Sequence, residues 1–478
     1  MKITKNLLKI TLAGIVVLQL NACKIPSVIS PNADANTPQK YALRVDSINS
    51  ATINWKNFFK DTFLVNLIDT ALHNNQELKI VSQEIEIMRN EARAKSGEYL
   101  PFARFRAGSG FEKPGRYTLM GATEHTVEAE PGKALPEPLT DIGLMADISW
   151  EVDVWHKLRN AQKSTYKRFL ASQEGRNFMI TNLIGEIANA YYELLALDNQ
   201  MEIVNQNITI QENALEIVKL LKQSAQTTEL AVKKFEAEVL KNKSLRYNIA
   251  QKIVETENYI NFLVGRFPQP VLRNSEQFNE LTPRKVYAGI PSDLLANRPD
   301  IREAELDLQA NKLDVQVARA NFYPSFSITS GIGFQAFNAG YLVKAPESML
   351  YNLAGDMVAP LINRRAIIAE YKNANARQIQ SVVAYQQKIL NGYVEVSNKV
   401  SKIQNLENQF TLKQLQVNAL TESINIANSL FASARADYME VLLTQRDALE
   451  ARVELVETKK EQLLATVDLY RALGGGWR

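Results

Sequence analysis

The sequence predicts a mainly α-helical chain with a small amount of β-structure, arranged as two copies of one unit. Apolar residues recur every seven positions over long stretches, which indicates coiled-coil helices. Four shorter stretches alternate apolar and polar residues, as β-strands with one buried face do. Only 20 glycines and 16 prolines occur in 478 residues, which leaves few turns and favours long elements.

The charge balance excludes one class of function. The chain has 55 Lys+Arg against 52 Asp+Glu, a net charge of +3, and no basic run with interleaved aromatic residues. Nucleic-acid binders carry a strongly basic surface, so we expect no nucleic-acid partner. The hydrophobic content of 46% is that of a folded chain rather than a disordered one.

The N-terminus has the pattern of a bacterial secretory signal, predicted over residues 1–22. Three lysines precede an apolar stretch that is too short to cross ~30 Å of hydrocarbon as a helix. The only cysteine, Cys23, has Leu three positions before it and Ala directly before it, which resembles a lipobox. We therefore expect lipid attachment at Cys23 and a lipid-anchored segment over 23–60; the alternative is an ordinary signal with an incidental cysteine. Lys24 replaces the Asp that retains many lipoproteins in the inner membrane, so the outer membrane is permitted.

Self-similarity divides the rest of the chain into two copies. Pro101 aligns with Pro324, and Gly265 aligns with Gly474. The second pair is separated by fewer positions than the first, so the second copy is the shorter one, and we place the shortfall in a loop after the aligned prolines. The predicted domains are a first repeat over 61–268, an inter-repeat linker over 269–297 and a second repeat over 298–478.

Each copy carries one long helix and a shorter one. Heptads run through 180–215 and again through 382–431. A helix over 156–222 has 67 residues and a length of about 100 Å. Each long helix meets a polar break, at 224–228 or 432–437, after which the heptads resume, so we expect two antiparallel helical hairpins. A cytoskeletal or scaffold coiled coil would fit these helices taken alone.

The alternating stretches argue against a simple coiled coil. Residues 141–154 alternate strictly, 325–335 do so nearly as well, and 105–111 and 351–361 do so weakly. Four strands cannot close a barrel, and an open sheet edge in lipid leaves backbone groups unpaired. We therefore expect several chains to share one barrel, whereas a soluble sandwich would need more strands. The acidic residues expected to face its lumen are Asp141, Asp147, Glu151 and Asp153.

Six blocks together resemble the outer-membrane efflux proteins, the TolC-like outer membrane factors, and in particular their lipoprotein branch in tripartite RND-type efflux systems. The blocks PSDLLANRPDI and LYRALGGGW are the specific ones, and the helical blocks are less so. The resemblance spans the mature chain. Its six blocks are 55–78, 149–159, 263–268, 290–301, 320–325 and 469–477.

The resemblance implies a homotrimer in which 12 strands form one β-barrel atop a periplasmic α-helical barrel. It also implies an exit duct in the cell outer membrane, lipid-anchored and extending into the periplasm. Such a duct passively conducts small molecules or metal ions delivered by an inner-membrane efflux transporter and a periplasmic adaptor protein. Two alternatives remain open at this point: an exit duct for protein secretion, and a non-channel coiled-coil scaffold lipoprotein.

In the family, the two hairpin turns close the duct and meet the adaptor. The family's turn glycines are replaced here by Ala225 and Ala434. Alanine is tolerated where φ is negative and costly where φ is positive, so either the turns are helical or they differ from the family. Asp437 is either a contact or gate residue or a solvated carboxylate at a helix start. The residues that the resemblance implies for adaptor contact and gating are Ala225, Thr228, Glu229, Leu230, Ala434, Asp437 and Tyr438.

No set of residues points to catalysis. The three histidines are scattered, and one cysteine cannot build a cysteine-based zinc site. The string Gly331-Ile332-Gly333 imitates a dinucleotide-binding turn, but no helix pattern opens after it, so we interpret it as part of a strand. We therefore expect no enzymatic activity, no cofactor and no metal site.

Overall fold

The computed structural model describes residues 27, 33, 35–41, 48–362, 364–433 and 435–478. The predicted signal peptide, the lipid-attachment residue Cys23 and the turn residue Ala434 lie outside these residues. The chain forms two compact units. Unit 1 contains Ile87–Phe169 and Asp307–Val382, and unit 2 contains Ala33–Glu86, Leu170–Leu306 and Val383–Arg478. Each unit contains segments of both copies.

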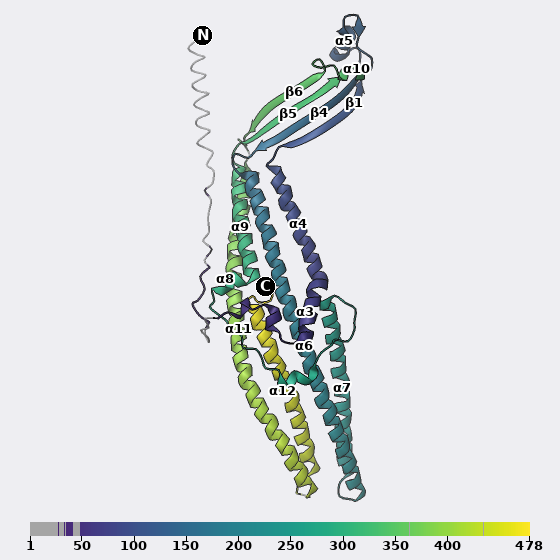
Figure 1. The fold of residues 1–478 in the computed structure, drawn as a ribbon, viewed down its shortest axis with the longest axis vertical. Coiled ribbons are helices and arrows are strands. Elements are labelled where there is room, and N and C mark those ends of the chain that lie inside the picture. Colours follow the sequence, from purple (N-terminus) through teal and green to yellow (C-terminus); the bar gives the residue numbers. More distant parts are fainter. Residues whose placement is uncertain (1–26, 28–32, 34, 42–47, 363, 434) are drawn as a thin grey trace. The chain divides into compact units, whose positions relative to one another are not determined.

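Unit 1 is built around one antiparallel sheet of four strands, in the order β1-β4-β5-β6 (Figure 1). The expected alternating segments all form strands, two per copy. The weakest expected strand, over 351–361, begins two residues earlier and ends at Val358, before Pro360. The four strands are β1 (Phe102–Glu112), β4 (Leu139–Val152), β5 (Ser325–Ala336) and β6 (Met349–Val358).

The two hairpin loops of this sheet differ in length. The loop between β1 and β4 spans 113–138 and contains α5 (Leu119–Thr126) and a small ribbon of β2 (Glu128–Glu130) and β3 (Lys133–Ala134). The loop between β5 and β6 spans only 337–348 and contains α10 (Ala339–Leu342). The difference between the two loops equals the shortfall that the aligned prolines and glycines predict for the second copy.

The long helices follow the heptads. The helix predicted over 156–222 is α6 (Lys157–Gln223), and it has the predicted 67 residues. After the polar breaks, α7 (Glu229–Val264) follows α6, and α12 (Tyr438–Ala472) follows α11 (Arg365–Ala432). No helix in the described part of the chain is both long and apolar enough to cross a membrane. The other helices are η1 (Ser50–Thr52), α2 (Trp55–Phe58), α3 (Thr62–Asn74), α4 (Gln76–Glu98), η2 (Ser275–Glu280), α8 (Asp293–Asn297) and α9 (Pro299–Ala320).

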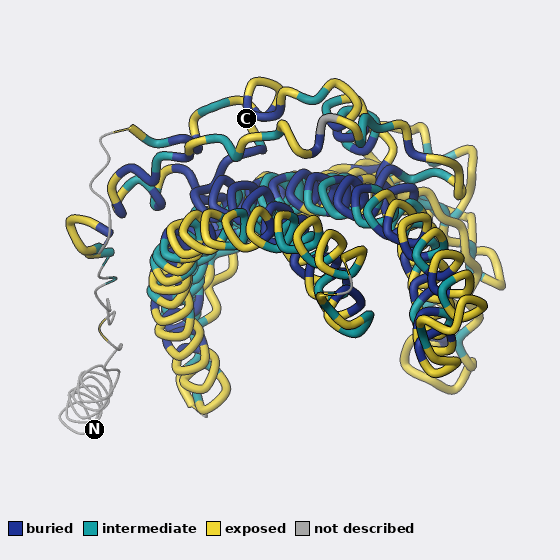
Figure 2. Tube along the Cα trace, turned by 90° about the horizontal axis from the view of Figure 1, so that it is seen from below, coloured by how far each residue is buried: buried dark blue, intermediate teal, exposed yellow. Residues whose placement is uncertain are grey.

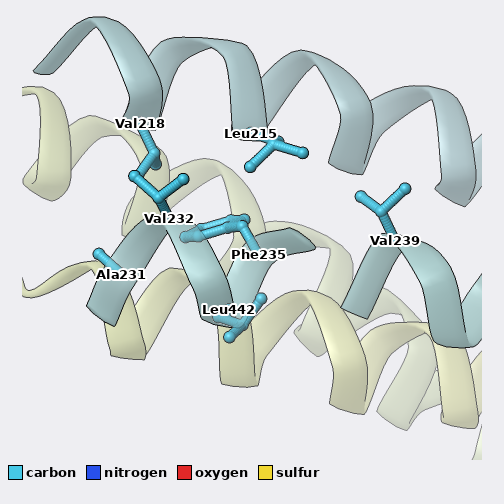
Figure 3. Close-up of a cluster of buried hydrophobic side chains, with 7 residues drawn as sticks. All are labelled: Leu215, Val218, Ala231, Val232, Phe235, Val239 and Leu442. Carbon is cyan, nitrogen blue, oxygen red and sulfur yellow. The ribbon is translucent and has the colours of Figure 1, made fainter. Parts of the chain in front are cut away.

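Heptad residues form the cores of the hairpins in unit 2. Along the long helices, buried residues follow the sides by which neighbouring helices face one another, and exposed residues cover the free sides (Figure 2). One cluster near the hairpin turns joins α6, α7 and α12 (Figure 3). Its buried members are Leu215, Val218, Ala231, Val232, Phe235, Val239 and Leu442.

The second helix of each hairpin ends against the backbone of a distant asparagine in unit 2. Gly265 follows α7 with a φ of 76°, and a Cβ there would lie 2.5 Å from the carbonyl oxygen of Asn74. Gly474 lies just after α12 with a φ of 88°, and a Cβ there would lie 2.5 Å from the carbonyl oxygen of Asn297. Only glycine combines a positive φ with so close an approach. These two helix-end contacts explain why a glycine stands at both aligned positions.

In the second copy this contact adjoins a buried charge cluster. Arg298 donates from Nε and Nη2 to the two carboxylate oxygens of Asp300, at 3.0 and 2.9 Å, and both residues are buried. Its Nη1 donates to Glu395 Oε2 at 2.8 Å and to the carbonyl oxygen of Ala472 at 2.7 Å. Burial alone would lower the pKa of Arg298, but these acceptors raise it above its usual range. The cluster joins the block NRPD to the end of α12, so the two most specific sequence blocks pack together.

Candidate functional site: a two-faced sheet and two helical turns

One face of the sheet is apolar and exposed. Residues directly opposite one another in the register share a face, and this places most of the large apolar side chains of the four strands on one side. Soluble monomers rarely expose so continuous an apolar surface. The large exposed side chains on this face include Phe105, Leu144, Ile148, Ile332, Tyr351 and Leu353.

The opposite face carries the predicted lumen carboxylates Asp141, Asp147 and Glu151. Gln335 Nε2 donates to Asp141 Oδ1 at 2.8 Å. Arg106 Nη2 lies 2.6 Å from Asp147 Oδ2, and Lys157 Nζ lies 2.5 Å from Glu151 Oε1. These three acids therefore share one polar face, on which each has a polar partner.

The fourth predicted lumen residue, Asp153, belongs to a helix start and not to the strand. The alternation predicts a strand to Val154, but β4 ends at Val152. The Asp153 carboxylate accepts hydrogen bonds from the backbone N–H groups of Leu158 at 3.0 Å and Arg159 at 2.9 Å. It thereby satisfies free donors in the first turn of α6. The expectation that Asp153 continues the strand alternation is wrong, because capping of the next helix decides its place.

Two glycines on the polar face let β4 and β5 approach each other. A Cβ at Gly333 would lie 2.3 Å from the carbonyl oxygen of Leu144. Gly331 lies opposite Asp147 in the register, and a Cβ there would lie 3.2 Å from the terminal methyl carbon of Met145. β5 continues through both glycines to Ala336. The Gly-x-Gly string is thus part of a strand, as the sequence indicates.

Both outer strands of the sheet have a free edge. Within the described residues, β1 pairs only with β4, and β6 pairs only with β5. Each edge therefore presents a row of backbone N–H and C=O groups without a strand partner. A long exposed edge of this kind is a template for pairing with another chain.

The structure shows the backbone conformation of Ala225, the residue that replaces the family's glycine in the turn between α6 and α7. Ala225 has a φ of 57°, in the left-handed region. The Gln226 N–H donates to the Leu221 carbonyl oxygen at 2.9 Å, and the Ala225 N–H donates to the Lys222 carbonyl oxygen at 2.9 Å. This is the hydrogen-bond pattern of a Schellman helix end, in which glycine is the usual residue. Of the two alternatives for this turn, the helical one is wrong, and Ala225 takes a conformation that costs alanine free energy.

The other predicted residues of this turn, Thr228, Glu229 and Leu230, lie at the start of α7. The Thr228 hydroxyl oxygen accepts a hydrogen bond from the Ala231 N–H at 3.3 Å and caps the helix. Glu229 pairs with Lys222 across the turn, and this hydrogen bond lowers the pKa of Glu229. Leu230 is exposed. The turn therefore presents an apolar side chain beside an ion pair.

The turn between α11 and α12 differs at the matching position. Asp437 occupies the N-cap position of α12, but its exposed side chain makes no capping hydrogen bond. Tyr438 packs against the cluster that joins α6, α7 and α12. Both turns lie at the same end of unit 2 (Figure 1). The structure thus gathers the predicted turn residues that it describes at one end and leaves the Asp437 carboxylate available.

Among the described residues, no group of three or more His, Cys, Asp or Glu side chains is placed to hold a metal ion. The described chain instead presents a sheet with one apolar and one polar face, and long helical hairpins. These features are typical of channel-forming outer-membrane proteins.

The outer membrane efflux protein family model matches residues 67–266 and 290–475, so the chain belongs to this family. The probable outer membrane lipoprotein SilC of Salmonella typhimurium is 26% identical over 93% of this chain and 93% of its own. The pyoverdine export outer membrane protein OpmQ of Pseudomonas aeruginosa strain PAO1 is 27% identical over 96% and 95%. The crystal structure of the open Neisseria gonorrhoeae MtrE outer membrane channel covers 95% of this chain and 98% of its own, with a TM-score of 0.82 at 22% identity.

These matches confirm the family that the six blocks indicate and the predicted fold class. The family model also confirms the predicted localisation to the outer membrane. Lipid attachment at Cys23 and the extension into the periplasm remain predictions. The lumen position of the carboxylates, the role of the turns and the domain boundaries remain predictions.

Proposed function

We propose that the chain forms a passive, trimeric exit duct of a tripartite efflux pump. The observation that carries the proposal is the two-faced sheet with two free edges. Its apolar face fits lipid, and its polar face fits a water-filled lumen. Three subunits of four strands supply twelve, enough to close a barrel in which each free edge meets the next subunit. Asp141, Asp147 and Glu151 then line the lumen.

The two helical turns are the proposed contact with the pump. Ala225, Thr228, Glu229 and Leu230 of one turn, with Ala434, Asp437 and Tyr438 of the other, bind the periplasmic adaptor and narrow the duct at rest to a constriction of low but measurable conductance. Docking of the adaptor and the inner-membrane transporter then favours the open state, because they bind that state more tightly. The chain itself catalyses no reaction in this scheme, and it needs no cofactor.

The N-terminal segment completes the placement of the duct. Lipid attached to Cys23, after removal of residues 1–22, anchors the segment 23–60 to the outer membrane. Several acyl chains at ~0.8 kcal/mol per buried methylene make such an anchor stable. The repeats 61–268 and 298–478, joined by the linker 269–297, then form the duct. Its cargo is small molecules or metal ions.

The proposal is tested by single-channel conductance of the purified full chain in planar lipid bilayers. We compare Asp141→Cys on the polar face with the matched variant Ile148→Cys on the apolar face of the same strand. A charged, water-soluble thiol reagent is expected to reduce the conductance of the Asp141→Cys channel, because the thiol faces water. It is expected to leave the Ile148→Cys channel unchanged, because that thiol faces lipid.

Two results would contradict the proposal. One is the absence of any conductance from protein that is correctly inserted. The other is an equal response of both cysteine variants, which would mean that the two faces of the sheet do not separate lipid from water.

A further inference from the structure

Some charged side chains of the sheet have no ion-pair partner among the described residues of the chain. Asp141, Asp147 and Glu151 of β4 have the polar partners described above. Arg104 and Glu112 of β1 and Asp356 of β6 have no ion pair among the described residues, and Glu112 is at the opposite end of β1 from Arg104. The nearest group given for the Arg104 guanidinium is the ring of Phe102, whose centre is 6.0 Å away. Asp356 is exposed and is the only charged residue of β6.

Arg104 and Asp356 lie on the two free edges and share a face. Arg104 is opposite Asp147, Asp147 is opposite Gly331, and Gly331 is opposite Asn352. Asp356 is four residues beyond Asn352, so its side chain is on the same polar face. The basic residue therefore belongs to one free edge of the sheet and the acidic residue to the other.

They also lie at the same end of the sheet. The strands alternate in direction, so the start of β1 and the end of β6 are at one end. Arg104 is the third residue of β1, and Asp356 is the third from the end of β6. If the β6 edge of one subunit pairs with the β1 edge of the next, the alternation makes the pairing antiparallel. Aligned strand ends then bring Asp356 opposite Arg104 or opposite its same-face neighbour Arg106.

We propose that Asp356 of one subunit pairs with Arg104 of the next subunit, directly or diagonally, and thereby fixes the register of the seam between subunits. The partner surface is a second molecule of this chain, and the inference rests on the shared sheet of the proposed function. Arg106 forms an ion pair with Asp147 of its own subunit, on the inner strand β4. The charges therefore alternate from β4 across the seam, in the order Asp147, Arg106, Asp356 and Arg104.

A side-chain contact is needed to fix the register of the seam, because backbone hydrogen bonds alone do not specify which residues lie opposite one another. A slip by one residue would move apolar side chains to the polar face, so it is excluded by burial. A slip by two residues keeps every side chain on its face and costs little through the backbone. Cross-strand charge pairs discriminate between these registers, since opposite charges are favourable and like charges directly opposite are destabilising. Such pairs contribute to specificity more than to affinity.

The test measures the register by disulfide cross-linking of the full chain after oxidation in membranes. Met357→Cys on β6 is combined in turn with a cysteine at Ala103, Phe105 or Phe111 of β1, all expected on the apolar face. We expect covalent trimers with Ala103→Cys or Phe105→Cys, which lie next to Arg104, and none with Phe111→Cys. Each single-cysteine variant gives the background of the chain's own Cys23.

The charges are then changed in the cross-linking background. Asp356→Arg is expected to lower the covalent trimer fraction by about threefold, because it places like charges together across the seam. Adding Arg104→Asp in the same chain restores an opposite-charge pair and is expected to restore the fraction. Glu112→Gln is the matched control, because Glu112 is on the same edge and face at the other end of β1, and it is expected to change nothing.

The outcomes separate this inference from the proposed function. Cross-linking that is unaffected by Asp356→Arg, or not restored by Arg104→Asp, would overturn the charge pair while leaving the shared sheet intact. The absence of covalent trimers with all three β1 cysteines, in protein of monomeric mass, would overturn the shared sheet itself.

Discussion

The two helix-end contacts of unit 2 share the close approach of a glycine to a backbone carbonyl group, but they differ in the side chains beside it. In the first copy, Gly265 lies against Asn74, and the next residue, Asn75, donates from its side chain to the Leu263 carbonyl oxygen at 2.8 Å. In the second copy, Gly474 lies against Asn297, and the next residue, Arg298, donates to the Ala472 carbonyl oxygen at 2.7 Å. The shared part is the glycine and the close approach. The difference is a neutral amide in one copy and a buried ion cluster in the other.

The fold therefore requires the close approach of the glycine and not the charge beside it. Both side chains satisfy a carbonyl group at the end of a hairpin helix, which would otherwise be buried without a partner. Arg298 does so at the cost of burying a charge, which Asp300 and Glu395 compensate. The second copy should therefore be the more sensitive to substitution.

The largest effect is expected from Arg298→Ala. Removing the guanidinium leaves the buried Asp300 carboxylate without its partner, and such a change costs about 3–5 kcal/mol of stability. Asn75→Ala, the equivalent change in the first copy, removes two neutral hydrogen bonds, one to the Leu263 carbonyl oxygen and one from the Leu78 N–H, and should cost about 2 kcal/mol. Urea unfolding of the detergent-solubilised chain, followed by circular dichroism, gives both values. Equal losses would show that the charge cluster adds nothing.

The glycines themselves should be equally sensitive in the two copies. Gly474→Ala and Gly265→Ala each place a Cβ 2.5 Å from a carbonyl oxygen at a positive φ. We expect each to cost about 2–4 kcal/mol in the same unfolding measurement. Gly97→Ala in α4 is the control, because a Cβ there meets nothing within 4 Å, and it should be neutral or stabilising. If Gly265→Ala left the free energy of unfolding unchanged while Gly474→Ala lowered it, the two contacts would not be equivalent.

Asp468 on α12 gives a pH-dependent difference between the copies, because the aligned residue of the first copy is Tyr259. Burial alone would raise the pKa of Asp468, but hydrogen bonds from Lys399 at 2.6 Å and Asn189 at 3.1 Å hold it below its usual value. The stabilisation is present above the usual pKa and is lost as pH falls through the lowered one. Asp468→Asn should therefore cost about 1–2 kcal/mol at pH 7 and progressively less below about pH 4.

The unfolding of wild type and Asp468→Asn is measured from pH 7 to pH 3. Glu450→Gln, an exposed change on the same helix, serves as the reference for general effects of acid. A stability difference that stays constant over this range would mean that the ionised Asp468 carboxylate is not the source of the stabilisation.

The smallest expected effect compares the two helix starts at the turns. Thr228→Ala removes the cap of α7 and should cost about 1 kcal/mol. Asp437→Ala removes no capping bond and should cost close to nothing, which leaves its carboxylate free for a partner. Thermal unfolding of both variants against wild type measures the difference. A loss for Asp437→Ala as large as that for Thr228→Ala would assign this carboxylate to α12 itself.

The sequence predicts regular features well and long-range ones poorly. The predicted ends of α6 are right to within one residue, because heptads run through its interior, an alternating stretch precedes it and a polar break follows it. The expected strand runs too far, to Val154, because two-residue alternation continues past Val152, and only the position of the next helix shows that Asp153 caps it. Gly474 in the block LYRALGGGW can be seen in the sequence. The reason why a glycine is required there cannot, because the backbone of Asn297, against which Gly474 lies, is distant along the chain.

The candidate site divides in the same way. The register confirms that Asp141, Asp147 and Glu151 share a face, as their spacing predicts. The positive φ of Ala225 could not be read from the sequence, which allowed either sign. The free edges follow from the strand order, which alternation alone does not specify.

The central claim is that three chains complete one sheet, and native mass spectrometry of the detergent-extracted full-length protein tests it most directly. A complex of three times the mass of one processed chain, which dissociates only when the sheet unfolds, is the expected result. A stable monomer or dimer with an intact sheet would contradict the account, because the free edges of β1 and β6 would then have no partner.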